Sequence, residues 1–299
     1  MLVKELKKQF CNQLELIYDA EEIDIFFFMI TEYFYDFRRI DFSLKPDFEI
    51  QNIAEWETII SDLKQEKPIQ YILGEAWFYG MSFKVNDNTL IPRSETEELV
   101  EWIIESVKTK VESQKNVTSS GVEMFILDIG TGTGCIPISL KTNLPEAEVF
   151  AIDISGEALE VAKFNAKQKE VQVNFIQSDI LKVEDLLSLR AESRSLPKLD
   201  IIVSNPPYVR NLEKVEIKKN VLEYEPHLAL FVEDNDALLF YRKIAQLALQ
   251  ALKPSGFLFF EINQYLGKET VEMLIQLGYQ NIELRKDLKG NDRMIKCSL

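Results

Sequence analysis

Histidine and cysteine are scarce in this 299-residue chain, which restricts the chemistry that it can perform. The only histidine is His227, and we expect it to be a solvated or capping residue rather than a catalytic base. The three cysteines, Cys11, Cys135 and Cys297, stand far apart, without the paired spacing of a zinc site or a disulfide framework. We therefore expect reduced thiols and no bound metal.

Basic residues are also fewer than acidic ones. Lys and Arg total 34 residues against 49 for Asp and Glu, which gives a formal net charge of -15 and a pI of about 4.7. A surplus of negative charge repels nucleic-acid phosphates at long range. We therefore expect a protein or small-molecule partner and no direct binding of nucleic acid.

Long apolar runs are missing as well. The most apolar run, residues 23–30, is far shorter than the roughly 20 residues that a membrane-spanning helix needs. The first residues, MLVKELKKQF, lack the uninterrupted apolar region of a secretory signal. We therefore expect no membrane segment and a cytoplasmic location.

What the chain does contain is an ordinary globular composition, with 46% hydrophobic and 28% charged residues, at a length that favours one large and one smaller domain. Residues 1–73 hold no glycine and repeat apolar residues at helical spacings, as at Phe10, Leu14 and Ile17. They predict a small helical bundle. Residues 74–93 contain two short β-like runs and predict a hairpin linker.

Residues 94–299 predict a different kind of fold. Ser94 to Glu97 have the form of a capping box, so a helix should begin at Ser94 and end in the polar stretch at 119–121. Beyond it, strand-like runs alternate with amphipathic helical segments, which is typical of a doubly wound, Rossmann-like α/β sheet. A tight turn before the last run predicts an antiparallel strand. The predicted strands are 125–129, 149–152, 173–176, 201–203, 257–262, 282–287 and 293–298, with a solvated loop at 187–198.

A glycine-rich loop follows the strand at 125–129 and precedes a helical pattern. Glycine permits positive φ and lets the backbone approach a ligand, while the next helix offers unpaired N–H groups. About 20 residues later, Asp153 ends a strand, where its carboxylate can accept both hydroxyls of a ribose. The spacing G-T-G-T-G, with Asp128 before it, favours S-adenosylmethionine over a dinucleotide. The predicted cofactor-binding residues are Gly130, Thr131, Gly132, Thr133, Gly134 and Asp153.

The strand at 201–203 ends abruptly in Asn205-Pro206-Pro207-Tyr208. The prolines cannot continue a central strand, and they leave rigid carbonyls at the carboxyl end of the sheet, where ligands of open α/β folds bind. A carboxamide or exocyclic amine nitrogen is a poor nucleophile because its lone pair is delocalised. If the Asn205 side-chain oxygen and the Pro206 carbonyl each accept one N–H, they orient that nitrogen and stabilise its developing positive charge, while Tyr208 packs on the flat group. The motif predicts methyl transfer, with Asn205, Pro206 and Tyr208 catalytic and Pro207 also holding substrate.

These motifs resemble those of the release factor glutamine methyltransferases, and the resemblance covers most of the chain. It rests on residues 68–74, 90–97, 127–134, 165–166, 204–208, 225–226, 229–230, 240–242 and 290–293. It implies a substrate-recognition domain at 1–73, a linker at 74–93 and a methyltransferase domain at 94–299. It also implies that Asn205 and Ile180 contact the cofactor, Ile180 standing where family members often carry an aromatic residue.

The activity implied by the resemblance is S-adenosylmethionine-dependent N5-methylation of the glutamine in the Gly-Gly-Gln motif of bacterial peptide chain release factors, which act in translation termination. The product of the cofactor is then S-adenosylhomocysteine. Three alternatives stay open: a glutamine methyltransferase for a ribosomal protein, an adenine-N6 methyltransferase for nucleic acid, and a non-catalytic binding protein. The net charge disfavours the second, and the intact motifs disfavour the third. The acidic run at 233–236 lacks the glycine and distal glutamate of an EF-hand, so we expect a solvated loop there.

Overall fold

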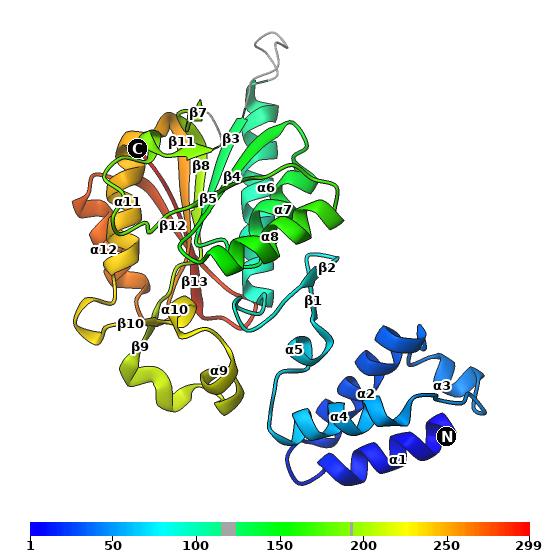
Figure 1. The fold of residues 1–299 in the computed structure, drawn as a ribbon. Helices are drawn as coiled ribbons and strands as arrows, with labels where there is room; N and C mark the ends of the chain where they lie inside the picture. Colours follow the sequence, from blue (N-terminus) through cyan, green and yellow to red (C-terminus); the bar gives the residue numbers. More distant parts are fainter. Residues whose placement is uncertain (115–123, 192–193) are drawn as a thin grey trace. The chain divides into compact units, whose positions relative to one another are not determined.

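The computed structural model of the chain describes residues 1–114, 124–191 and 194–299. These residues form two compact units, one helical and one built on a large sheet (Figure 1). The helical unit consists of Met1–Glu75 and Lys218–Tyr224, and the sheet-containing unit consists of Ala76–Ile217 and Glu225–Leu299.

The helical unit surrounds an aromatic core. Phe10, Phe27 and Trp56 are fully buried. The ring centroid of Phe10 lies 5.7 Å from those of both Phe27 and Trp56, in edge-to-face arrangements. The helical spacing of the apolar residues places these rings on inward faces, which confirms the predicted bundle. Its helices are α1 (Val3–Leu14), α2 (Ala20–Tyr35), α3 (Asp41–Leu44), α4 (Ile53–Lys64) and α5 (Ile69–Leu73).

A short helix from much later in the chain also belongs to this unit. In α9 (Lys219–Tyr224), the Tyr224 hydroxyl donates to the Gln65 carbonyl at 2.9 Å, and Lys219 Nζ lies 3.0 Å from Glu66 Oε1. Both contacts are exposed, so each contributes little to stability. No periodic pattern in the sequence links residues 218–224 to the first 75, and the sequence did not predict their association.

A hairpin follows the helical bundle, as predicted. It pairs β1 (Glu75–Phe78) with β2 (Met81–Lys84). The two turn residues, Tyr79 and Gly80, have φ of 49° and 74°. Positive φ at both central residues is the requirement of a type I′ turn, whose twist matches that of the flanking strands.

The sheet of the second unit has seven strands in the order β12-β13-β11-β8-β3-β4-β5. Neighbours from β11 to β5 pair in parallel, and β13 runs antiparallel to both β11 and β12. Each predicted strand is present, and the antiparallel strand near the C-terminus is confirmed. The strands are β3 (Met124–Ile129), β4 (Ala147–Asp153), β5 (Asn174–Gln177), β8 (Leu199–Ser204), β11 (Leu252–Glu261), β12 (Gln280–Lys286) and β13 (Asp292–Ser298).

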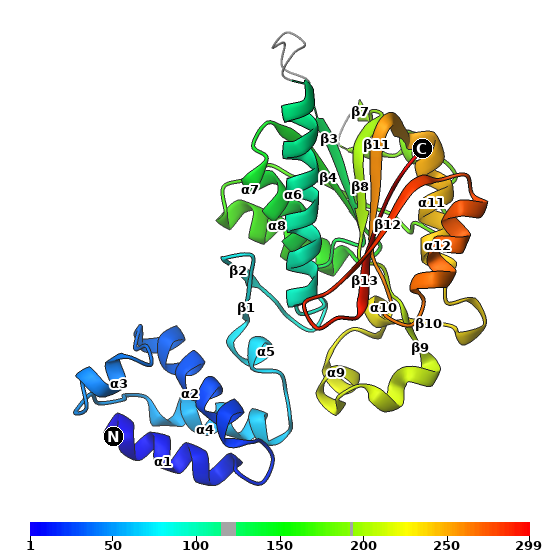
Figure 2. The same cartoon turned by 180° about the vertical axis from the view of Figure 1, so that it is seen from behind.

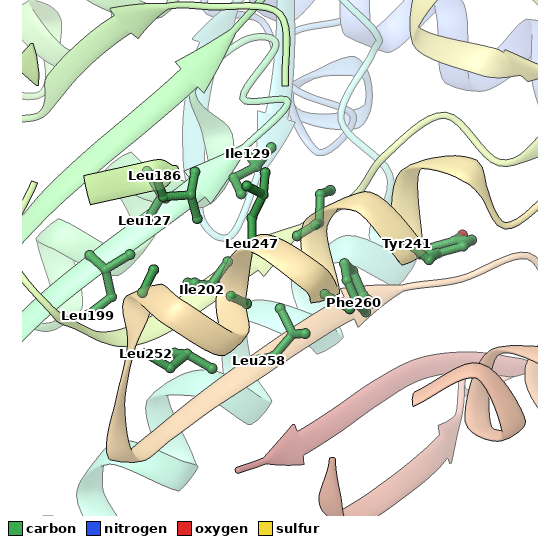
Figure 3. Close-up of a cluster of buried hydrophobic side chains, with 14 of the residues drawn as sticks. Leu127, Ile129, Leu186, Leu199, Ile202, Tyr241, Leu247, Leu252, Leu258 and Phe260 are labelled. Carbon is green, nitrogen blue, oxygen red and sulfur yellow. The ribbon is translucent and has the colours of Figure 1, made fainter. Parts of the chain in front are cut away.

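Helices cover both faces of this sheet (Figure 2). Along β3, Leu127 and Ile129 face the apolar cluster beneath α11 (Figure 3), whereas Ile126 faces the opposite cluster beneath α6 and α7. Burial on both faces explains why β3 reads as a continuous apolar run rather than an alternating one. One face carries α6 (Ser94–Gln114), α7 (Cys135–Asn143) and α8 (Gly156–Gln168); the other carries α11 (Leu239–Ala251) and α12 (Gly267–Gln276).

Two predicted segments extend beyond the residues that the structure describes. Helix α6 begins at Ser94 as predicted, but its predicted end at 119–121 lies outside the described residues. The predicted loop at 187–198 contains short regular elements, because Leu196 packs into the core beneath α11 and anchors the segment; residues 192–193 are not described. The short elements are η1 (Leu186–Ser188), β6 (Arg190–Ala191), β7 (Arg194–Ser195), β9 (Val209–Arg210), η2 (Asn211–Glu216), α10 (His227–Leu230), β10 (Phe231–Val232) and η3 (Asp234–Asp236).

Candidate active site

The carboxyl ends of β3, β4, β5 and β8 surround a cavity of about 540 Å³. In an open α/β sheet this edge is where ligands bind. The loop at 87–93 and the segment at 226–229 also contribute to its wall. Gly134 and Tyr208 lie outside the lining. The predicted site residues that line the cavity are Gly130, Thr131, Gly132, Thr133, Asp153, Ile180, Asn205, Pro206 and Pro207.

The glycine loop is a tight turn held by the end of β4. The N–H groups of Gly130 and Thr131 donate to the Ile152 carbonyl at 2.8 and 3.0 Å. Gly130 and Gly132 have φ of 80° and 53°, in the left-handed region that favours glycine. A Cβ at Gly132 would meet no atom within 4 Å. The loop therefore presents bare backbone to open space in the cavity.

Gly134 has a packing role instead. A Cβ at this position would lie 3.1 Å from the Cβ of Ala162 on α8, closer than ordinary contact. Beside it, the buried Asn165 of α8 donates to the carbonyls of Thr133 and Lys84, at 2.9 and 3.0 Å, and accepts from the Lys84 N–H at 2.8 Å. Asn165 thus joins the glycine loop to strand β2 of the hairpin.

Asp153 supports the same loop from the end of β4. Its Oδ2 accepts from the Gly132 N–H at 2.8 Å, and its Oδ1 accepts from the Ser155 N–H at 3.0 Å. Burial raises the pKa of this carboxyl, and the backbone hydrogen bonds partly oppose the rise. Each carboxylate oxygen has two lone pairs, so each can accept one further hydrogen bond.

Asp128 lies beneath the loop with its side chain fully buried. Among the described residues, neither of its carboxylate oxygens has a hydrogen-bond partner. Burial raises the pKa of Asp128 to about 7. The Thr131 hydroxyl is near enough to oppose that rise, although its position does not satisfy hydrogen-bond geometry. A carboxylate in this setting costs stability when it ionises.

Asn205, which follows β8, ends a chain of hydrogen bonds that spans three elements. Its Nδ2 donates to Oγ1 of Thr96, in the first turn of α6, at 3.3 Å. The Thr96 hydroxyl donates to Oε2 of Glu261, the last residue of β11, at 2.6 Å. Thr96 and Glu261 are both buried. The residues that hold Asn205 therefore come from distant parts of the chain.

Tyr208 lies behind the cavity wall. Its ring packs against the apolar cluster beneath α11, and its hydroxyl donates to Oε1 of Glu261 at 3.1 Å. Burial, together with the negative charge of Glu261, raises the pKa of Tyr208 well above its usual value. The stacking of its ring on a substrate group stays a prediction.

Comparisons with known proteins decide the family. A methyltransferase-domain family model matches residues 120–292. A release factor glutamine methyltransferase of Flavobacterium psychrophilum is 57% identical over 300 residues, covering 100% of this chain and 99% of its own. The chain belongs to the release factor glutamine methyltransferase family. A family member of the same name from Bacteroides thetaiotaomicron is 40% identical and covers 96% of both chains.

A solved structure agrees with this family's fold. The hMettl16 catalytic domain, in complex with MAT2A 3'UTR hairpin 6, is 16% identical and superimposes with a TM-score of 0.53, covering 74% of this chain and 76% of its own. At that identity the likeness shows the fold alone. The chain is therefore a methyltransferase with a Rossmann-like catalytic unit and a helical N-terminal unit.

Sequence reasoning assigned no role to several residues that shape the site of this methyltransferase. Arg93 Nη2 lies 2.6 Å from Oε1 of the buried Glu225, whose Oε2 accepts from the Ile91 N–H at 3.2 Å. This ion pair joins the loop at 87–93 to the segment at 226–229. Residues of both segments line the cavity. Both lie in segments that resemble the family, but local sequence does not reveal which residue partners which.

His227 and the acidic run at 233–236 make local structural contacts. His227 is exposed at the start of α10, with its ring edge-on to Phe231 at 5.2 Å between centroids. In the acidic run, residues 233–235 are exposed as predicted, and residues 234–236 form a short 3-10 turn in which Asp236 pairs with Arg242 through two contacts of 3.0 Å. Within the described ranges, no group of three or more His, Cys, Asp or Glu residues could hold a metal ion, and no helix is long and apolar enough to span a membrane.

Proposed function

We propose that this chain methylates, in the cytoplasm, the side-chain N5 of the glutamine in the Gly-Gly-Gln motif of peptide chain release factors, with S-adenosylmethionine as methyl donor. The names of its full-length relatives support this activity. One observation carries the proposal. The Asn205 carboxamide, with its Nδ2 already bonded to Thr96, lines the same cavity as the glycine loop and Asp153.

The residues on the loop side of the cavity fit S-adenosylmethionine. Gly130 and Gly132 leave space against bare backbone, and each oxygen of Asp153 can accept one further hydrogen bond, as the two ribose hydroxyls require. Ile180 lines the cavity as an apolar surface for a purine. When bound, S-adenosylmethionine supplies a methyl group that is already activated on a sulfonium sulfur.

On the acceptor side, the chain itself orients the nucleophile. The Asn205 side-chain oxygen and the Pro206 carbonyl each accept one N–H of the glutamine carboxamide. Pyramidalisation at the nitrogen is thereby favoured, and the positive charge that develops on it is stabilised until the methylated nitrogen releases one proton to solvent. Pro206 is buried and Pro207 half-buried on the wall, so these acceptors are rigid and cost little reorganisation.

We also propose that the helical unit recognises the protein substrate. Outside its aromatic core it exposes large apolar side chains, with Leu16 95%, Ile40 60% and Leu44 69% accessible. These side chains are accessible to a protein partner. We expect Leu16→Ser to raise KM for the release factor and to leave Kd for S-adenosylmethionine unchanged. The role would be contradicted if KM stayed unchanged in each of Leu16→Ser, Ile40→Ser and Leu44→Ser.

The activity is tested by methyl transfer from labelled S-adenosylmethionine. The substrates are a purified release factor, the same factor with the Gln of its Gly-Gly-Gln motif changed to Ala, a ribosomal-protein mixture and duplex DNA. We expect label on the intact release factor and none on its Ala variant. Label on the Ala variant would place the reaction at another residue. Label on ribosomal protein or on DNA alone would replace the proposed substrate, and no label on any of the four would contradict the proposal.

A further inference from the structure

The carboxamide of Asn205 can face the cavity in two ways that differ by a half-turn of the amide group. In one orientation Oδ1 faces the substrate nitrogen and accepts its N–H. In the other, Nδ2 faces that nitrogen and offers only donors. The two ends of a carboxamide have nearly the same shape, so packing alone does not choose between them. A hydrogen-bond partner behind the residue has to make the choice.

The chain of hydrogen bonds behind Asn205 has a defined direction. Glu261 is 1% exposed, and its Oε2 lies 2.6 Å from the Thr96 hydroxyl. The Thr96 hydroxyl is the donor in this contact, so its single proton is directed to Glu261. The Thr96 oxygen then has only lone pairs to offer Asn205, and the atom that it can accept from is Nδ2, at 3.3 Å.

We propose that Thr96 and Glu261 are positioning residues that fix the orientation of the Asn205 carboxamide, so that Oδ1 faces the substrate nitrogen. This inference rests on the proposed function, because it takes Asn205 to hold the acceptor amide. The inference assigns a role to the start of α6 and to the end of β11, which meet only in the folded protein. Thr96 lines the cavity and Glu261 lies behind it.

The other oxygen of Glu261 is held as well. The Tyr208 hydroxyl donates to Oε1 at 3.1 Å, so both carboxylate oxygens are used as acceptors. Burial raises the pKa of Glu261, and the hydrogen bond from Thr96, the positive charge of Arg293 on β13 and the hydrogen bond from Tyr208 oppose that rise. Tyr208 therefore acts on Asn205 from the far end of the chain of hydrogen bonds. Its hydroxyl thus has a role in the motif beside the predicted stacking of its ring.

The test compares full-length Thr96→Val and Thr96→Ser with Thr109→Val, which makes the same change on the exposed side of α6. For each variant, kcat and KM for the release factor and Kd for S-adenosylmethionine are measured. We expect Thr96→Val to lower kcat by about 10-fold to 100-fold, as is common when a group that orients a functional residue is lost. Both KM and Kd should stay near the wild-type values. Thr96→Ser should restore most of kcat, and Thr109→Val should leave it unchanged.

A double-mutant cycle separates positioning from a general structural effect. In an Asn205→Ala background, Thr96→Val should cause no further loss of kcat, because no carboxamide is left to orient. Glu261→Gln is the second variant if Thr96→Val does not fold. Its single side-chain oxygen cannot serve both Thr96 and Tyr208, so the same loss and the same non-additivity with Asn205→Ala are expected.

The outcomes distinguish this inference from the proposed function. If the wild-type protein methylates the release factor, but Thr96→Val and Glu261→Gln keep wild-type kcat or lose it equally in both backgrounds, the positioning role alone is overturned. If the wild-type protein does not methylate the release factor, the proposed function fails and the inference fails with it.

Discussion

In the proposed function, the donor half of the cavity comes from the stretch Gly130 to Asp153 together with Ile180, whereas the acceptor half around Asn205 takes Thr96 from α6 and Glu261 from β11. The donor half is shaped by backbone: positive φ at the glycines and N–H groups bonded to Asp153. The acceptor half is shaped by side chains whose positions depend on the whole sheet. Substitutions in the first half should therefore affect cofactor affinity, and those in the second should affect turnover.

Asn205→Ala should show the largest effect and should appear in turnover. The variant loses the side-chain oxygen that orients the acceptor nitrogen, so we expect kcat to fall by about 10² or more, as for loss of one preorganised polar contact in other enzymes. Steady-state methylation of the release factor measures kcat, and calorimetric titration measures Kd for S-adenosylmethionine. We expect Kd to change little. Wild-type turnover, or a loss confined to Kd, would remove the distinction between the two halves.

Asp153→Asn should show a smaller effect, in the donor half. The Asn side chain has one acceptor oxygen, so it cannot accept from both the Gly132 N–H and the Ser155 N–H and also bind two ribose hydroxyls. We expect Kd for S-adenosylmethionine to rise about 10-fold, which corresponds to loss of about one hydrogen bond to a charged group. At saturating S-adenosylmethionine, kcat should recover. A variant that loses kcat under saturation, with unchanged Kd, would place Asp153 in the acceptor half.

Asp128→Asn should have the smallest effect on activity, because its effect should appear in stability instead. The pKa of Asp128 is about 7 in the folded protein, above the ordinary value of 3.8. The folded protein therefore keeps a proton that the unfolded chain has lost between these values. This contribution to stability is present at low pH and is lost as the pH rises through about 7.

We accordingly expect the free energy of unfolding of the wild-type protein, relative to Asp128→Asn, to fall from about pH 5 to about pH 7 by up to ~1.4 kcal/mol per pH unit. Urea denaturation of both proteins across this range measures the difference, and the subtraction removes the titration of other groups. A difference that does not depend on pH would mean that Asp128 is ionised throughout, and an increase with pH would mean that its pKa is lowered.

Most of the fold was accessible from the sequence because its signals are local. The helical spacing around Phe10 and Phe27, the strand at Met124–Ile129 and the glycine at position 80 each depend on a few neighbouring residues. The exceptions are segments without a strong local pattern. Residues 187–198 are rich in Ser and Arg, and the described part of this segment is anchored by Leu187, Leu189 and Leu196, which pack against the core. Residues 218–224 join the helical unit through Gln65 and Glu66, far away in sequence.

For the candidate site, the sequence likewise predicted the residues with a local signal but not their distant partners. The glycine loop, Asp153 and Asn205 were found because strand context and residue type identify them, and nine of the predicted site residues line one cavity. Their partners were not found. Arg93 and Glu225, or Thr96 and Glu261, are separated by more than a hundred residues, and no spacing rule connects them. Tyr208 was predicted as part of a motif, but the contact made by its hydroxyl was not predicted.

The sequence by itself determined the two kinds of fold, the order of strands along the chain and the residue types at the carboxyl edge of the sheet, because propensity, periodicity and turn chemistry act over short distances. The tertiary structure alone decided which buried polar groups pair. It brought Glu261 to Thr96 and Thr96 to Asn205, and it left Asp128 without a partner among the described residues. A hydrogen bond depends on distance in space and on which group carries the proton, and both follow from packing of the whole sheet.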